Sequence, residues 1–137
     1  MTRQQTITIA TRGRGTIEIT AEVVAIVRAA HLACGLAHIF VLHTSCSVIL
    51  TENADPAVRR DLDLLARRWA PDADPAYAHR DEGDDDMAAH GRSVLAGSSI
   101  TVPVTDGELV LGTWQGIYLW EHRTQPQRRT IVITVLG

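Results

Sequence analysis

The chain has 137 residues, a length typical of one domain, and its 45% hydrophobic and 21% charged residues are ordinary for a globular protein. Its 13 Lys and Arg against 16 Asp and Glu give a formal net charge of −3, which argues against a nucleic-acid-binding protein. No apolar run is long enough for a membrane span, and two cysteines do not make a disulfide framework. We therefore expect one cytoplasmic domain over residues 1–137, with neither a membrane nor a nucleic-acid partner.

Hydrophobic periodicity predicts strands and helices along the whole chain. Strands are expected at Gln5–Ala10, Thr16–Ile19, Ala37–Leu42, Val48–Thr51, Ser99–Val104, Leu109–Gly112, Gln115–Leu119 and Thr130–Leu136. Apolar residues at helical spacing predict three helices, which begin after the N-cap Thr20, at Pro56 and near Met87. This order predicts an α+β domain with a mostly antiparallel or mixed sheet.

Turn residues and apolar faces refine these elements. The Arg12–Gly15 turn predicts a hairpin of the first two strands, and Asp106-Gly107 predicts another hairpin. The first helix is expected to carry Cys34 on its apolar face and to end at Gly35. Both cysteines are interpreted as small buried residues. The second helix is expected to bury one apolar face, formed by Val58, Leu62, Leu65 and Trp69.

Histidines and carboxylates are the candidate chemistry. His43 ends a buried strand, and His79 and His90 flank a segment with five carboxylates. Zinc takes three or four such ligands, so the three histidines would form a metal site if the fold brings them together. The carboxylates also suit magnesium, and Asp86 lies one helical turn from His90. A solvated acidic loop that caps a helix is the alternative interpretation.

Two further groups of residues are candidates for ligand binding. In Gly112-Thr113-Trp114-Gln115-Gly116 the glycines allow close approach to a ligand, and Gln115 offers both a hydrogen-bond donor and an acceptor. The alternative is a turn whose Trp114 packs in the core. Arg123, Arg128 and Arg129 match the geometry of phosphate, although such charges near a terminus are often simply solvated.

Together, these motifs resemble the YjbQ family, described as secondary thiamine-phosphate synthase. The resemblance runs from the first strand to the last. Its motifs are His43-Thr44-Ser45, Glu52-Asn53-x-Asp55-Pro56-x-Val58-Arg59-x-Asp61, His79-x-x-Glu82-Gly83-x-x-Asp86-x-x-x-His90, Leu95-x-Gly97-x-Ser99 and Gly112-Thr113-Trp114-Gln115-Gly116-Ile117. His122 stands where many relatives carry Phe, so no site role is carried over to it.

The resemblance implies a fold, an assembly and a reaction. The fold is an α+β sandwich whose mixed, mostly antiparallel sheet curls into a partial barrel with helices packed on it, and the assembly is a homotrimer. His43, His79 and His90 would hold a divalent metal, zinc or magnesium. The reaction is a transfer that condenses a pyrimidine pyrophosphate with a thiazole phosphate, giving thiamine phosphate and pyrophosphate.

For that reaction we expect specific roles for the motif residues. The expected catalytic residues are Glu82, Asp86 and Gln115. The expected contacts to a small phosphorylated substrate are Ser45, Asn53, Thr113, Trp114, Arg123 and Arg128. Two alternatives stay open: a metal-dependent hydrolase of a small phosphorylated metabolite, with Glu82 or Asp86 as base, and a non-enzymatic trimeric metal-binding protein.

Overall fold

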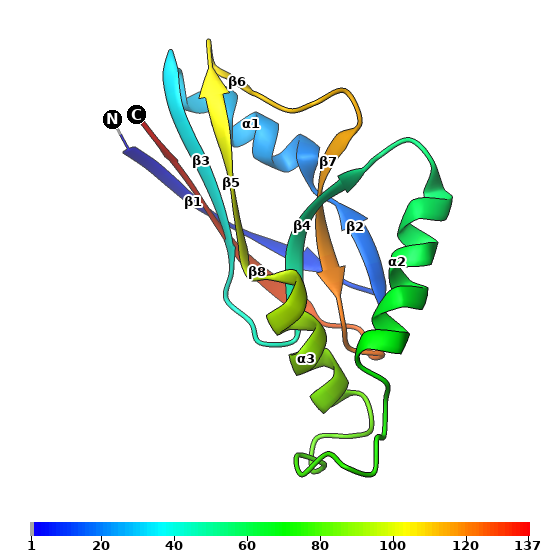
Figure 1. Ribbon diagram of the computed structural model, residues 1–137. Coiled ribbons are helices and arrows are strands. Elements are labelled where there is room, and N and C mark those ends of the chain that lie inside the picture. The colour runs from blue at the N-terminus through cyan, green and yellow to red at the C-terminus, as the bar shows by residue number, and fades with distance from the viewer. Residues whose placement is uncertain (1) are drawn as a thin grey trace.

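A computed structural model describes residues 2–137, which form eight strands and three helices (Figure 1). In chain order these are β1 (Thr2–Ala10), β2 (Gly15–Glu18), α1 (Thr20–Ala30), β3 (Cys34–Val41), β4 (Cys46–Glu52), α2 (Pro56–Trp69), α3 (Asp86–Ala96), β5 (Ser99–Thr105), β6 (Glu108–Leu109), β7 (Gln115–Glu121) and β8 (Arg128–Leu136). One sheet has the order β1-β8-β3-β5-β6 and the other β2-β7-β4. Every strand pair within residues 2–137 is antiparallel, and the predicted α+β class with a curled, mostly antiparallel sheet is confirmed.

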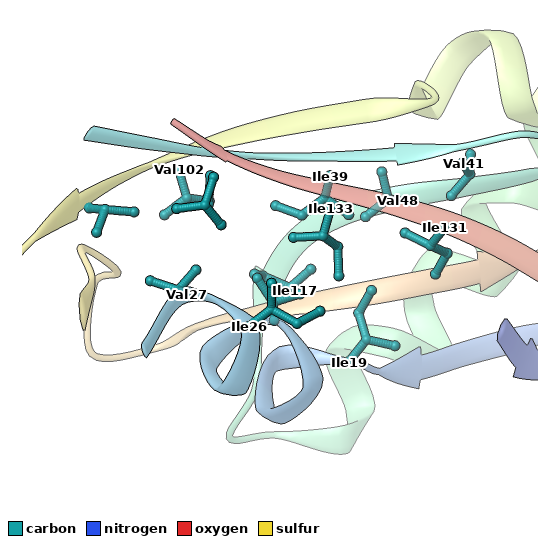
Figure 2. Close-up of a cluster of buried hydrophobic side chains, with 14 of the residues drawn as sticks. Ile19, Ile26, Val27, Ile39, Val41, Val48, Val102, Ile117, Ile131 and Ile133 are labelled. Carbon is teal, nitrogen blue, oxygen red and sulfur yellow. The ribbon is translucent and has the colours of Figure 1, made fainter. Parts of the chain in front are cut away.

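Helix α1 contacts both sheets with one apolar face and supplies one wall of the core. It contacts β1, β6 and β8 of the larger sheet and β7 of the smaller one. Its buried residues Val23, Ile26 and Val27 pack in one cluster with isoleucines such as Ile39 and Ile133 (Figure 2). Because aromatic residues make up only 4% of the chain, this core consists mainly of Val, Ile, Leu and Ala.

Helices α2 and α3 cover the opposite face of the three-stranded sheet. Successive side chains of a strand point to opposite faces, and in β7 Leu119 belongs to the core around α1. The next residue, Trp120, donates its indole N–H to Asp63 of α2 at 3.0 Å. Ser93 of α3 donates to the carbonyl of Cys46 at 2.9 Å. Strand β7 is therefore buried on both faces, and α3 is fixed where β4 begins.

The predicted hairpin of the first two strands is wrong. Strand β1 pairs with β8, and β2 pairs with β7, so the turn carries the chain from one sheet to the other. Gly13 in this turn has a φ of 104°, and a Cβ there would lie 2.5 Å from the Thr124 carbonyl oxygen. The turn packs closely against the connection from β7 to β8. By contrast, the predicted Asp106-Gly107 turn does join β5 to β6, with φ of 51° and 77°.

The first helix ends earlier than the sequence predicts. His31 adopts the left-handed conformation, with φ of 53°, directly after α1. Gly35 lies inside β3, and Cys34 is exposed on that strand. Cys46 is buried as predicted, and burial raises the pKa of its thiol to about 12.

Two other predicted elements differ in extent or burial. The apolar face of α2 is only partly covered: Leu65 and Trp69 are 37% and 51% exposed, and Ala66 is the buried residue of the helix. The strand predicted at Leu109–Gly112 is the short β6. No helix within residues 2–137 is long and apolar enough to cross a membrane.

Candidate metal site

Three side chains with metal-ligating atoms meet at the start of α3. Asp86 and His90 share one face of the helix, one turn apart, and the preceding loop brings His79 beside them. The Oδ2 atom of Asp86 lies 2.7 Å from His79 Nε2 and 3.2 Å from His90 Nε2. One ligand atom from each of the three residues lies within 4.8 Å of the others. This is a spacing that a single ion can bridge.

The hydrogen bond of His90 fixes which ring nitrogen carries its proton. Its Nδ1 lies 3.1 Å from the carbonyl oxygen of Thr44, which can only accept, so Nδ1 is the donor. In the neutral ring Nε2 then carries a lone pair and faces the carboxylate oxygen of Asp86. Two acceptors face each other only if a proton or a cation lies between them. The residues present thus fit a cation.

Arg123 holds the acidic end of α3 in position. Its Nη1 donates to Asp86 Oδ1 and its Nε donates to Asp85 Oδ2, each at 2.9 Å. Its Nη2 donates to the carbonyl of Glu82 at 2.9 Å. Arg123 therefore occupies one oxygen of Asp86 and leaves Oδ2 to the histidines, as an outer-shell partner of a metal ligand does.

Asp85 anchors α3 to the chain after β7. Burial raises the pKa of this carboxyl, but hydrogen bonds from Arg123 and from the Thr124 backbone outweigh burial and hold it at about 2. The same contacts raise the pKa of Arg123, chiefly through its bond to Asp85. Asp85 is thus used structurally. The Glu82 side chain, predicted to be catalytic, is exposed.

His43, the third histidine predicted as a ligand, does not join this cluster. Its Nε2 accepts the backbone N–H of Thr130 at 2.8 Å. Burial and the Arg129 guanidinium lower the pKa of His43. His43 and His90 nevertheless line one surface hollow, so His43 is a neighbour of the site. Asp86 takes its place among the grouped ligand atoms.

A buried charged network beside His43 was missed by sequence reasoning. Arg129 is paired with Glu121, and both are almost fully buried. Arg129 also donates to Ser45 Oγ at 3.0 Å, and Thr11 donates to Glu121 at 2.7 Å. Period-2 alternation in β8 was the available signal, because Arg129 shares the inward face of Ile131. Arg128, predicted to bind phosphate, faces outward and is exposed.

The remaining predicted ligand-binding residues lie at the opposite end of the β4–β7 ladder. Glu52 pairs with Gln115 at one end, and Cys46 pairs with Glu121 at the other. Six residue steps at about 3.3 Å each put roughly 20 Å between these ends. The residues at the far end are Asn53, Thr113, Trp114 and Gln115, and Trp114 is 61% exposed. The single chain does not bring them to the metal-ligating cluster.

His122 occupies an enclosed position next to the site. Its side chain is 0% exposed, its Nε2 lies 2.7 Å from Ser47 Oγ, and its Nδ1 has no hydrogen-bond partner within residues 2–137. Burial, together with three surrounding arginines, lowers its pKa to about 3. His122 is therefore a neutral residue of the protein interior, which agrees with leaving it out of the predicted site.

Comparison with known proteins gives a consistent family relationship. The profile of the family described as "UPF0047 protein YjbQ-like" matches residues 5–137. The UPF0047 protein sll1880 of Synechocystis is 42% identical over 98% of this chain and 91% of its own length. UPF0047 protein YjbQ of Salmonella typhimurium is 43% identical over 98% of this chain and 97% of its own.

Solved structures agree with the fold. A YjbQ/UPF0047 protein of Clostridium acetobutylicum matches with a TM-score of 0.89 at 32% identity, covering 96% of this chain and 99% of its own. A hypothetical protein of Aeropyrum pernix matches with a TM-score of 0.90 at 27% identity, covering 98% of each chain. These comparisons overturn the expected thiamine-phosphate synthase activity: UPF0047 is a family of unknown function, and neither these relatives nor these structures carry evidence of that reaction.

Proposed function

The chain belongs to the UPF0047 YjbQ-like family, and we propose that it is a metalloprotein in which His79, Asp86 and His90 hold one divalent ion. The observation that carries this proposal is the convergence of two ring nitrogens on Asp86 Oδ2, at 2.7 and 3.2 Å. The fixed Nδ1–H tautomer of His90 supports it, because this tautomer turns a lone pair towards the carboxylate. Asp86 is 5% exposed, so this carboxylate is not part of a solvated acidic loop.

The donor set favours zinc over magnesium. Two imidazole nitrogens and one carboxylate oxygen suit zinc, whereas magnesium prefers oxygen ligands and bound water. Three protein ligands leave one coordination position open, as in catalytic rather than structural zinc sites. Bound zinc would supply a Lewis acid that lowers the pKa of water to about 7. The side chain of His79 is 45% exposed and that of His90 is 33% exposed, so the open position would face solvent.

Within this proposal the chain itself has two tasks. Thr44 orients His90 through its carbonyl, and Arg123 orients Asp86 by occupying Oδ1. Both contacts fix ligand geometry from outside the site. The open position supports an enzyme that acts on a small molecule. Hydrolysis is the reaction class that fits, because a Lewis acid and water suffice and no second organic substrate is needed.

Zinc titration of purified variants tests the site. Wild-type protein should bind one zinc ion per chain, and Asp86→Asn should lose most of the affinity. Arg123→Met should weaken binding by about 10- to 100-fold, the usual effect of an outer-shell change. Asp84→Asn is the matched control, since Asp84 is an exposed neighbour that is not one of the three grouped residues. His43→Ala should retain zinc, in contrast to a three-histidine site.

Elemental analysis of the same preparations identifies the metal. Zinc at one ion per chain in wild type and Asp84→Asn, and little in Asp86→Asn, supports the proposal. Protein without a tightly bound divalent ion, or equal binding by all variants, contradicts it.

The cytoplasmic setting expected from the sequence stays part of the proposal and agrees with two unpaired cysteines, Cys34 and Cys46.

A further inference from the structure

A continuous groove runs from the candidate metal site across His43. Two adjoining surface hollows share His43, Thr44 and Ser98 as lining residues. One, of about 320 Å³, reaches His90 and Val94. The other, of about 450 Å³, continues past Phe40 and Leu42. Hollows of this size suit a small organic ligand, and one end of the groove is a residue of the metal-ligating cluster.

The chemistry of the groove is uncharged. No Asp, Glu, Lys or Arg side chain lines either hollow within residues 2–137. The two nearby guanidinium groups are engaged elsewhere: Arg123 with Asp85 and Asp86, and Arg129 with Glu121. Arginine and lysine side chains are common phosphate ligands, and neither hollow offers one among residues 2–137. The lining of the groove therefore favours an uncharged ligand over the phosphorylated substrate expected from the sequence.

His43 contributes a hydrogen-bond donor of fixed identity. Because its Nε2 accepts the Thr130 N–H at 2.8 Å, the proton of the neutral ring is on Nδ1. This Nδ1–H has no acceptor within residues 2–137, and His43 lines both hollows. His43 thus offers a neutral N–H donor on a residue that lines both hollows, between His90 and the apolar Phe40 and Leu42, and such a donor matches a ligand with a carbonyl oxygen.

We propose that this groove is the substrate cleft of the metal site, and that it takes an uncharged carbonyl compound, such as an ester or amide, with an apolar tail. The carbonyl oxygen accepts from His43 Nδ1–H, and the tail lies along Val94 and on to Phe40 and Leu42. This inference rests on the proposed metal function. It adds the substrate class and gives His43 a binding role in place of the predicted metal-ligand role.

Hydroxamates of different tails test the groove on the zinc-loaded protein. Hexanohydroxamate should bind at least about 10-fold more tightly than acetohydroxamate, because four further methylene groups leave water even in an open groove. A hydroxamate with a terminal phosphonate should lose this advantage. Isothermal titration measures the ratio without any assay of activity.

Two variants and a control localise the tail. Val94→Asp and Leu42→Asp should each reduce the hexano-to-aceto ratio towards one. Leu95→Asp is the control, since Leu95 is 65% exposed on the same helix but lines neither hollow. Zinc content is measured for every variant, because Val94 lies one helical turn from His90. A reduced ratio at unchanged zinc content supports the groove.

A ¹⁵N spectrum of the ring nitrogens tests the role of His43. The free protein should show His43 protonated at Nδ1, and saturation with hexanohydroxamate should shift that signal. An Nε2-protonated His43, equal binding of the two alkyl hydroxamates at full zinc content, or tightest binding of the phosphonate would overturn the inference while leaving the metal site intact. Absence of zinc binding would overturn the proposed function and this inference with it.

Discussion

His122 makes the stability of the protein depend on pH. Its pKa is about 3 in the folded chain because of burial and the surrounding arginines, against an ordinary value of 6.5. The unfolded chain therefore binds an additional proton between these values. The stabilisation is fully present above pH 6.5 and is lost as the pH falls towards 3. Between pH 7 and pH 5 this single residue should cost about 2 kcal/mol of unfolding free energy.

Urea denaturation of Ser47→Ala/His122→Phe at both pH values tests this prediction. The double variant removes the histidine together with the hydroxyl it contacts, so neither is left as an orphaned polar group. Its loss of stability between pH 7 and pH 5 should be smaller than that of wild type by about 2 kcal/mol. His38→Phe, on β3, is the control and should retain the wild-type difference. An unchanged difference in the double variant would contradict a buried neutral His122.

Local sequence patterns predict the position of some site residues and not of others. The cluster of His79, Asp86 and His90 could be predicted because helical spacing joins the last two and a short loop brings the first. The hydrogen bond that draws His43 to Thr130 joins residues 87 positions apart, so no local pattern reports it. The alternation in β8 predicts that Arg129 faces inward. It does not identify the buried partner that such a charge needs, because Glu121 comes from a different strand, β7.

Strands β3 and β8 approach each other too closely for a side chain at Gly35. A Cβ there would lie 2.2 Å from the Leu136 carbonyl oxygen and 3.1 Å from the Gly137 Cα. Both atoms belong to the backbone of the pairing strand or its end, so they cannot rotate away. Gly35→Ala should therefore force the two strands apart and lower the unfolding free energy by about 1–3 kcal/mol.

Chemical denaturation measures this cost against a matched glycine. In Gly91→Ala the new Cβ would lie 3.4 Å from Ala70 Cβ, an ordinary contact, and Gly91 lies within α3. Because alanine is the better helix former, this control should be neutral or stabilising by up to about 1 kcal/mol. Equal effects of the two substitutions would show that β3 and β8 do not need glycine at their contact.

Element boundaries show why Gly35 was misassigned. A glycine after an apolar helical pattern is a typical C-terminal signal, and the spacing from Val23 to Cys34 fits a helix. The chain instead ends α1 at His31 in the left-handed conformation, and Gly35 serves strand packing. The local spacing of apolar residues shows that a helix is present. Tertiary contacts with Leu136 decide where the strand after it begins.

Pairing of elements was the weakest prediction at the scale of the whole chain. Two neighbouring strands with a glycine turn between them suggest a hairpin, yet β1 pairs with β8 at the other end of the sequence. This pairing, with that of β2 and β7, makes the two sheets curl around α1. The α+β class followed from composition and element order, whereas the partners of each strand depend on covering the apolar face of α1 with strands of both sheets.

The exposed Gly112–Gly116 segment bears on assembly. Trp114 is 61% exposed, and Val110, just before the segment, is 51% exposed; neither belongs to the core cluster formed by residues 2–137. Tryptophan is enriched at protein–protein interfaces relative to the rest of the surface. We expect the homotrimer that the family resemblance implies, with Trp114 buried between subunits. The Gly112–Gly116 segment, which is distant from the metal-ligating cluster of its own chain, would then lie against a neighbouring subunit.

Sedimentation equilibrium decides between assemblies. Wild-type protein at micromolar concentration should have three times the 15.0 kDa mass of the chain. Trp114→Glu should dissociate the trimer, because a charge buried without a partner at an interface is strongly unfavourable. Trp69→Glu is the matched control, a similarly exposed tryptophan on α2, and should remain trimeric. A monomeric wild type would contradict the trimer. A trimer that survives in Trp114→Glu but dissociates in Trp69→Glu would place the interface at α2 instead of at the Gly112–Gly116 segment.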